Sequence, residues 1–331
     1  MLPMSVTTAG LADLGTIRVK KEKMYRVRVS VGGSCTPGET VYVRDLLQAG
    51  PAYDMTNLGE VPCGSEFLLK NMQTGSYVMQ ARNAKFGSNG EIAAAANVFG
   101  ALVTFDVGES NRNLALSMAH GVSVEGRVVA AQGSAPLPLD KIKVRSAGSP
   151  GILILENTAP ARAVDAEGRF RWDNLAPGPR GLLVDGLGTE FYIKQVRLRG
   201  IPIRGWLMDF PSDGTVEIEI DSQPAGIHGS VRNGDKPVAN ADVALLSWPL
   251  MEGSDPDDRT LVRHLTADAE GNFQAAGLAP GEYRIFAVTR SDLEQSQLPA
   301  VWTRLATTAE KVTLTRGGIS EVTLKVTDPS R

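Results

Sequence analysis

The sequence has few of the residues that metal binding and nucleophilic catalysis need. Three histidines and two cysteines occur among its 331 residues. The histidines, which are His120, His228 and His264, are far apart and form no HExxH or related metal-ligand spacing. Neither Cys-x-x-Cys nor Gly-x-Ser-x-Gly occurs. These absences argue against an enzyme, and we expect no metal and no other cofactor.

Long apolar runs and an excess of charge of one sign are also missing. No stretch approaches the roughly 18 apolar residues that a membrane-spanning helix needs. The formal net charge of −3 comes from 34 basic and 37 acidic residues, which are well mixed along the chain. Such a chain has no strong positive field to attract a nucleic acid or an anionic membrane. We therefore expect neither nucleic-acid binding nor membrane insertion.

What the chain does contain is a motif that recurs three times at a spacing of 103 residues. Phe170 in DAEGRFRWDNLAPG corresponds to Phe273 in DAEGNFQAAGLAPG and, more loosely, to Phe67 in CGSEFLLKNMQTG. A repeat of this length is too long for a solenoid unit and suits an independent domain. The sequence thus predicts three domains, which follow an N-terminal arm of residues 1–22 and comprise residues 23–120, 121–224 and 225–331.

Each repeat reads as a series of short strands. Apolar residues alternate with polar ones at the start of the first two copies, as at Tyr25, Val27 and Val29, which is typical of a half-buried strand. The 35 glycines and 19 prolines separate short apolar runs and favour tight turns over helices. We therefore predict an all-β fold of three tandem antiparallel seven-stranded β-sandwich domains, Ig-like or prealbumin-like in type.

Two glycine-containing motifs in the second and third copies predict turns. The DAEG motif places a glycine where a hairpin turn needs a positive φ. The APG motif then ends the strand, because proline cannot donate to a sheet ladder and glycine frees the turn. We expect the next strand to pair back onto the previous one. The residues concerned are Gly168, Pro177, Gly178, Gly271, Pro280 and Gly281.

The third copy carries a family resemblance. Its segments AGIHGSVRNGDKPVANADVALLS and TADAEGNFQAAGLAPGEYRIFAV resemble the carboxypeptidase regulatory-like domains, which are close in fold to transthyretin-like and collagen-adhesin B-type sandwiches. The second copy, with VEGRVV and DAEGRFRWDNLAPG, looks like the multi-repeat form found in large secreted bacterial envelope proteins. The resemblance implies a β-sandwich outside the cytoplasm and implies no catalytic residues.

The two cysteines both lie in the first copy, 28 positions apart. In an extracellular domain, Cys35 and Cys63 would form a disulfide that closes this loop. Two unrelated buried thiols are the alternative.

Some collagen-adhesin B-type domains hold a Lys-Asn isopeptide bond, for which Lys141 or Lys325 would be candidates once the strands are placed.

The N-terminal arm has a pattern of its own. Ile17 and Val19 align with Leu114 and Leu116, so residues 1–22 look like the last strands of a preceding repeat. They lack the pattern of a signal peptide. We expect a mature form or fragment of a longer chain, or a strand that pairs with a neighbouring subunit through Ile17 and Val19.

Two groups of residues could bind a ligand. Trp206, Trp248 and Trp302 fall near strand ends or loops, and an exposed tryptophan could hold a sugar ring, with Trp248 and Trp302 as the candidates for glycan contact. Packing in the core or at a junction is the alternative for each.

An acidic loop offers oxygen ligands for calcium but lacks the regular spacing of a known calcium loop, so we expect a solvated insertion. Its carboxylates are Glu252, Asp255, Asp257 and Asp258.

These observations lead to a function that is structural. We predict a non-enzymatic extracellular structural or adhesive rod that is secreted or held in the cell envelope and that assembles head to tail through its N-terminal strand. Its expected partners are further copies of itself or other cell-surface proteins, with polysaccharide as a further candidate. A carbohydrate-binding module is the alternative, and accessory domains of a larger secreted enzyme are another.

Overall fold

The computed structural model describes nine segments of the chain, which hold 24 strands and few helical residues. They are residues 23–47, 55–83, 99–108, 112–148, 161–175, 178–203, 207–249, 262–292 and 299–329. The strands build an all-β fold of three successive units, each with its own buried apolar cluster. Ile17, Val19, Pro177, Trp206 and the acidic loop of residues 252–258 lie outside the described residues.

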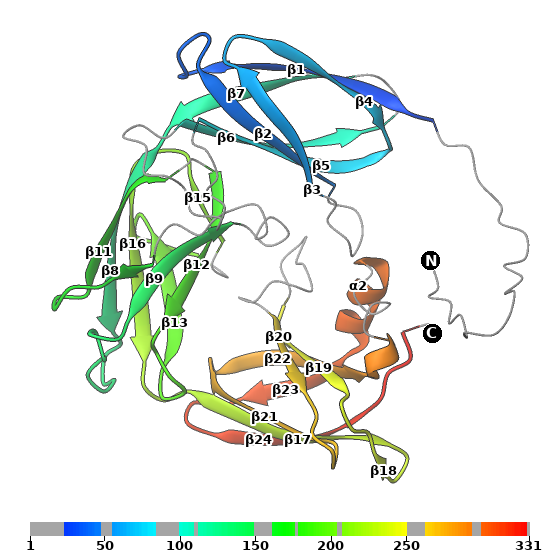
Figure 1. The fold of residues 1–331 in the computed structure, drawn as a ribbon. Coiled ribbons are helices and arrows are strands. Elements are labelled where there is room, and N and C mark those ends of the chain that lie inside the picture. Colours follow the sequence, from blue (N-terminus) through cyan, green and yellow to red (C-terminus); the bar gives the residue numbers. More distant parts are fainter. Residues whose placement is uncertain are drawn as a thin grey trace, which may run out of the picture.

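The first unit is a seven-stranded sheet folded over its core, in the order β3-β2-β5-β6-β7-β1-β4 (Figure 1). β6 connects the two halves of the sheet, because it pairs with β5 over most of its length and with β7 at Phe99 and Gly100. Alternate residues of β1, among them Val27 and Val29, point into the core. The strands are β1 (Tyr25–Gly33), β2 (Thr40–Leu47), β3 (Met55–Pro62), β4 (Glu66–Met72), β5 (Gly75–Arg82), β6 (Phe99–Val107) and β7 (Arg112–His120).

The second unit packs two sheets face to face. One sheet has the order β11-β8-β16-β13-β14 and the other β10-β9-β12-β15. Trp172 and Phe170 from β11 meet edge to face in the core, with ring centroids 4.9 Å apart. The strands are β8 (Val122–Ala130), β9 (Lys143–Gly148), β10 (Arg162–Ala163), β11 (Arg169–Leu175), β12 (Gly178–Asp185), β13 (Tyr192–Leu198), β14 (Ile201–Ile203), β15 (Leu207–Phe210) and β16 (Gly214–Asp221).

The third unit adds a helix to two sheets. β17 pairs with β18, β21 and β24 in one sheet, and the other has the order β20-β19-β22-β23. A short 3-10 helix, η1 (Arg290–Asp292), precedes the α-helix α2 (Pro299–Thr308). The strands are β17 (Ala225–Asn233), β18 (Lys236–Pro237), β19 (Asp242–Ser247), β20 (Val262–Thr266), β21 (Asn272–Leu278), β22 (Gly281–Val288), β23 (Glu310–Leu314) and β24 (Ile319–Lys325).

Strand number and direction differ from the prediction of seven antiparallel strands per domain. Among the described residues the three units have seven, nine and eight strands. In each unit the first strand also pairs in parallel with the last one, β1 with β7, β8 with β16 and β17 with β24. The chain crosses between the two halves or sheets of each unit before it returns, so its last strand arrives beside the first in the same direction. The prediction of purely antiparallel sheets was therefore wrong.

The turn motifs are corners between sheets rather than hairpins. Gly168 and Gly271 have φ values of 77° and 78°, and each directly precedes a strand of the other sheet. After the APG motif, Gly178 opens β12, which pairs with β9 and β15, and Gly281 opens β22, which pairs with β19 and β23. Pro280 directly precedes Gly281. The next strand thus joins the opposite sheet, and the expectation that it pairs back was wrong.

A glycine makes room for the repeated phenylalanine. Gly126 lies opposite Phe170 in the sheet, and Gly229 lies opposite Phe273, again 103 residues further along. A Cβ atom at Gly126 would come within 1.9 Å of the Phe170 ring, and one at Gly229 within 2.3 Å of the Phe273 ring. The ring therefore lies against the bare backbone of the neighbouring strand. In the first unit Val29 takes the place of this glycine, opposite Phe67.

Helix α2 was missed at the sequence level. It covers the outer face of the β20-β19-β22-β23 sheet through Trp302, Leu305 and Ala306, and Ala309, directly after the helix, joins them in a cluster with residues of that sheet. These four positions recur at the spacing of one helix face, and Pro299 is suited to the first helical turn. The segment EIAAAANVFGALV has alanines that favour a helix, but its described residues, from Phe99 onward, belong to strand β6.

The units follow one another along a curved path with short connections (Figure 1). β7 ends at His120 and β8 begins at Val122, while β16 ends at Asp221 and β17 begins at Ala225. Among the described residues, no helix has the length and hydrophobicity needed to cross a membrane.

Candidate functional site

The outer face of one sheet in the second unit carries most of the organised charge in the structure. Along β8, β11, β13 and β16, apolar residues such as Val124 and Ile218 point into the core. The alternate positions point outward and are mainly Arg, Lys, Glu and Asp. Ion pairs cross this face from strand to strand.

Two arginines of this face are already engaged by carboxylates. Arg171 donates to Glu125 at 2.8 Å and to Asp173 at 2.7 Å. Arg197 donates to Glu217 at 2.8 Å and to Glu219 at 3.2 Å. Exposed ion pairs of this kind add little stability, so their main effect is to fix the positions of the side chains.

Two further arginines of this face lack such a partner. Arg127 on β8 and Arg169 on β11 lie directly opposite each other across the antiparallel ladder, and both are exposed. Neither guanidinium group has a hydrogen bond or ion pair to any residue that the structure describes. Like charges at directly opposed positions repel each other. Arg127 and Arg169 therefore leave two positive charges without a neutralising carboxylate, on a face where Arg171, Lys194 and Arg197 all form ion pairs.

An open hollow of about 760 Å³ lies over this pair. Four arginines line it, with three carboxylates and the backbone of Gly126. Asp165, one of these carboxylates, stabilises the corner between β10 and β11. Its Oδ1 accepts hydrogen bonds from the backbone N–H groups of Glu167 at 3.0 Å and Arg169 at 2.7 Å. The hollow thus offers guanidinium groups to an anionic ligand, and among the described residues no cluster of His, Cys, Asp and Glu could hold a metal.

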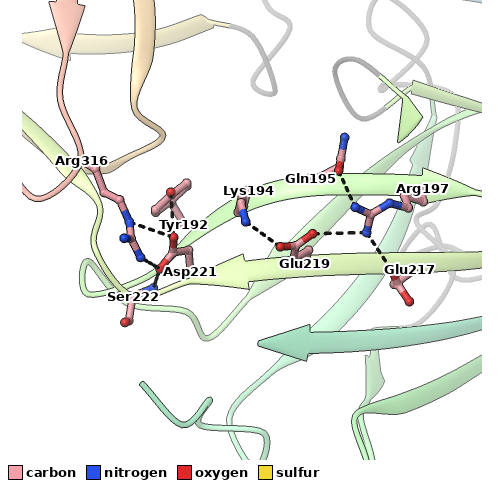
Figure 2. Close-up of polar contacts among 9 residues, drawn as sticks. All are labelled: Tyr192, Lys194, Gln195, Arg197, Glu217, Glu219, Asp221, Ser222 and Arg316. Carbon is pink, nitrogen blue, oxygen red and sulfur yellow. Dashed lines mark hydrogen bonds and ion pairs between the residues drawn. The ribbon is translucent and has the colours of Figure 1, made fainter. Parts of the chain in front are cut away.

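A second organised site lies where the second unit meets the third. Asp221, at the end of β16, is 3% exposed. It accepts hydrogen bonds from Arg316 at 2.9 and 3.1 Å, from the backbone N–H of Ser222 at 2.7 Å and from the Tyr192 hydroxyl at 3.2 Å (Figure 2). Because Arg316 comes from the β23-β24 turn of the third unit, this carboxylate joins two units.

The electrostatics of the junction follow from this contact. The hydrogen bonds from the Arg316 guanidinium lower the pKa of Asp221, against the opposing effect of burial. Burial, followed by the charge of Asp221, raises the pKa of Tyr192. Asp221 therefore stays ionised and Tyr192 stays protonated at neutral pH, which is the combination that their hydrogen bond requires.

Backbone contacts close the same junction. Gly317 N–H donates to the carbonyl of Gln223 at 3.1 Å, between the third unit and the connection. The Cβ position of Gly277, at the end of β21, lies 3.5 Å from Cα of Thr189 in the second unit. The third unit thus lies against both the connection and the second unit.

The junction and the charged face form one continuous strip (Figure 2). Next to Tyr192, the Lys194 ammonium donates to Glu219 at 2.8 Å, and Glu219 also accepts from Arg197. The hydrogen bond from Lys194 lowers the pKa of Glu219. Arg197 in turn lines the hollow.

The comparisons with known proteins find likeness in fold alone. Scans of family models and of curated proteins find no match. Among solved structures, the minor pilin of Streptococcus agalactiae is 14% identical, with a TM-score of 0.27 over 62% of this chain and 94% of that chain. A streptococcal ancillary pilin is 10% identical, with a TM-score of 0.27 over 92% of this chain and 99% of that one.

A third structure, the Bacillus anthracis TIE protein, is 11% identical with a TM-score of 0.24. The match covers 92% of this chain and 51% of that one, so this chain spans about half the length of that protein. TM-scores this low carry no argument about function.

The two cysteines lie together in the first unit. Cys35 and Cys63 form a disulfide with a Cα to Cα distance of 6.1 Å, and both are 5% exposed. Cys35 follows β1, and Cys63 lies in the corner between β3 and β4. The bond therefore ties the end of the first strand to a corner between the two halves of the sheet.

The two candidate glycan residues have different surroundings. Trp302 is 3% exposed and packs against Phe286, with ring centroids 5.6 Å apart, so no sugar ring can reach its face in this fold. Trp248 is half-buried, and the guanidinium of Arg284 lies over its ring at 4.6 Å from the centroid. One face of Trp248 is thereby occupied within the protein.

A histidine and the two lysines that the sequence analysis named have ordinary structural surroundings. His264 Nδ1 lies 3.0 Å from Asp242 on the neighbouring strand, which accounts for it structurally. Lys141 and Lys325 are both exposed, whereas an isopeptide bond needs a buried lysine. The features that sequence reasoning missed, the Arg127–Arg169 pair and the Asp221–Arg316 contact, depend on strand register and on contacts between residues far apart in the chain.

Proposed function

We propose that this chain is a non-enzymatic structural or adhesive element of the cell surface, in which successive β-units hold a fixed mutual orientation. The observation that carries the proposal is the junction between the second and third units. There, a three-residue connection, Ser222 to Pro224, is combined with the buried Asp221 carboxylate and its Arg316 partner. A structural element needs such fixed junctions because flexible linkers would let its units reorient under load.

Replacing Arg316 with methionine is expected to loosen this junction while leaving both units folded. The variant leaves Asp221 with Ser222 and Tyr192 as partners and removes the ion pair between the units. With spin labels on cysteines introduced at the exposed positions 143 and 236, the distance distribution should be narrow in the parent protein and clearly broader in the variant. The native cysteines are both in the disulfide, so the labels attach to the introduced thiols alone.

The same variant should change the response to acid. A carboxylate with a lowered pKa in the folded state contributes stability above its unfolded-state pKa and loses it as the pH falls through the folded-state pKa. Removing Arg316 removes the main cause of the lowering, so the acid unfolding midpoint should move to higher pH. Arg171→Met, which breaks an ion pair within the second unit, is the matched control. A broad distance distribution in the parent protein would refute a fixed junction, and equally narrow distributions in parent and R316M would refute its dependence on Arg316.

A second candidate function is binding of an anionic polysaccharide in the hollow over Arg127 and Arg169. It is favoured by the unpaired, opposed guanidinium groups, since a carboxylate placed between them would relieve their repulsion and accept hydrogen bonds from both. Neighbouring paired side chains, such as Glu125 and Glu217, offer acceptors for sugar hydroxyls. The open, polar shape of the hollow suits an extended chain better than a small buried ligand.

Polygalacturonate, a chain of uronic acids, is the probe for this candidate, with a neutral glucan beside it. We expect the parent protein to bind polygalacturonate, with an affinity that falls as the salt concentration is raised, and to show no binding to the neutral glucan. Arg127→Gln combined with Arg169→Gln should weaken binding by about tenfold or more, which corresponds to about 1.4 kcal/mol. Arg28→Gln, at an exposed arginine of the first unit, is the control. Equal affinity of parent and double variant would exclude the hollow as the binding site.

A further inference from the structure

Strand β4 forms an open edge of the sheet in the first unit. It stands last in the strand order, and among the described residues it pairs with β1 alone. Its sequence, EFLLKNM, runs for seven residues without a proline or a glycine. An edge strand of this kind presents unpaired backbone N–H and C=O groups, to which another strand can be added.

The ladder between β1 and β4 shows which backbone groups are open. Val31 of β1 donates its N–H to the carbonyl of Ser65 at 2.9 Å, so Ser65 and the alternate residues after it direct their backbone groups toward β1. The residues between them are Glu66, Leu68 and Lys70, whose backbone groups point to the other side. These groups form no hydrogen bond with any residue that the structure describes.

The side chains of the same three residues are exposed on the outer face of the sheet. Leu68 is 39% exposed, and Glu66 and Lys70 lie two residues to either side of it. Glu66 accepts a hydrogen bond from Arg28 at 3.2 Å through Oε2, and no described residue donates to its other oxygen. Lys70 has no ion pair within the described part of the chain. The edge thus carries an acid, an apolar side chain and a base in symmetric order.

We propose that two copies of this chain pair through β4, antiparallel and across a two-fold axis at Leu68. In this register Leu68 lies opposite Leu68 of the other copy, and Glu66 of each copy lies opposite Lys70 of the other. Each opposed pair can exchange two backbone hydrogen bonds, because the groups concerned point outward on both copies. This pairing goes beyond the proposed function, since it joins the first units of two chains and involves neither the N-terminal strand nor the hollow of the second unit.

The counterparts of β4 in the other two units are not suited to this pairing. β11 and β21 are also edge strands and carry the repeated phenylalanine at the same place. On β11, Arg171 takes the place of Leu68, so the same symmetry would set two arginines opposite each other. On β21, the carbonyl of Ala276, which takes the place of Lys70, already accepts a hydrogen bond from Arg263 at 2.8 Å. The arrangement that favours self-pairing is therefore particular to the first unit.

Charge reversal tests the opposed pairs. The native mass of the full chain in light scattering should rise with concentration toward twice 35.2 kDa. Glu66→Lys alone, or Lys70→Glu alone, sets like charges opposite each other twice, and each should weaken the dimer by about tenfold or more. An equimolar mixture of the two variants, and the double variant E66K/K70E, should both restore the dimer, because each arrangement again pairs opposite charges.

Cysteine cross-linking tests the register. Opposed residues of a hydrogen-bonded pair have Cα atoms about 5.5 Å apart, within the range of a disulfide. Leu68→Cys should therefore form a covalent dimer under mild oxidation, visible on a non-reducing gel. Glu66→Cys alone should not, because position 66 lies opposite position 70, whereas a mixture of Glu66→Cys and Lys70→Cys should. The native cysteines are both in the disulfide, so the introduced thiols react alone.

The controls separate this interface from other modes of association. Lys311→Glu, at an exposed lysine of the edge strand β23 in the third unit, should leave the dimer unchanged. Restoration on mixing also shows that the single charge variants are folded. A parent chain that stays monomeric at every concentration, charge variants that dimerise as the parent does, or equal cross-linking of L68C and E66C would overturn the proposal. Loss of self-association on deleting residues 1–22, with the charge variants unaffected, would overturn it in favour of head-to-tail assembly through Ile17 and Val19.

Discussion

Replacing both Cys35 and Cys63 with serine is expected to lower the free energy of unfolding of the first unit by about 3.5 kcal/mol. The disulfide closes a loop of 28 positions, and in the chain-entropy model a loop of this size restricts the unfolded chain by about that amount. The bond also ties the end of β1 to the corner between β3 and β4, so its loss frees a corner on which the core depends.

Calorimetry can follow this change separately in each unit if the three units unfold in distinct transitions. For a domain of about 100 residues, 3.5 kcal/mol corresponds to a fall in Tm of about 15 to 25 °C. The transition of the first unit should move by that amount, and the other transitions should stay in place, since Cys35 and Cys63 both belong to the first core. Mild reduction of the parent protein should reproduce the shift, and an unchanged first transition would contradict the prediction.

Trp302→Ala is expected to destabilise the third unit by about 3 to 5 kcal/mol, the usual cost of removing a buried tryptophan side chain. Trp302 is the largest side chain with which α2 covers the sheet, and it fills the space against Phe286. An isolated helix of ten residues is marginal in water, so α2 depends on this packing. We therefore expect the helix to detach from the sheet before the rest of the unit unfolds.

Hydrogen exchange is the measurement for this variant. Amides of α2 should lose most of their protection in W302A, while those of β17 and β21 in the other sheet should be much less affected. Trp302→Phe keeps an aromatic ring and should retain most of the stability, and Trp248→Ala at the half-buried site should cost less. Full protection of α2 in W302A would show that the helix does not depend on this side chain.

The sequence predicts the strands well because each strand has a local signal. Alternation at Val27 and Val29 marks β1, and the same pattern marks β8 and β16, since one face of each strand is buried. The repeated Phe170 and Phe273 likewise indicate equivalent positions in two units. These features depend on residues close together in the chain.

Pairing partners could not be predicted in the same way. The DAEG motif looks the same whether the next strand pairs back or crosses to the other sheet, because Gly168 and Asp165 satisfy the turn in either case. Parallel pairing of first and last strands joins segments about 90 residues apart, such as Val27 with Arg112, and no local pattern specifies it. This is why the sheets were wrongly expected to be purely antiparallel.

The candidate sites were hidden for the same reason. Arg127 and Arg169 become neighbours through the register of β8 and β11 alone. Asp221 and Arg316 are 95 positions apart and belong to different repeats, so neither residue draws attention in the sequence. Trp302, in contrast, was noticed because tryptophan is rare, but its burial follows from a helix that the sequence reading had missed.

The parallel pairing of first and last strands determines how each unit would respond to mechanical tension. Because the two strands run side by side in the same direction, the chain enters a unit at one end of this pair and leaves at the other. A pull on the two ends of the chain therefore acts along the strands, in shear, on all seven register positions at once. Hairpin-like pairing would instead let the ladder open one hydrogen bond at a time, at a lower force.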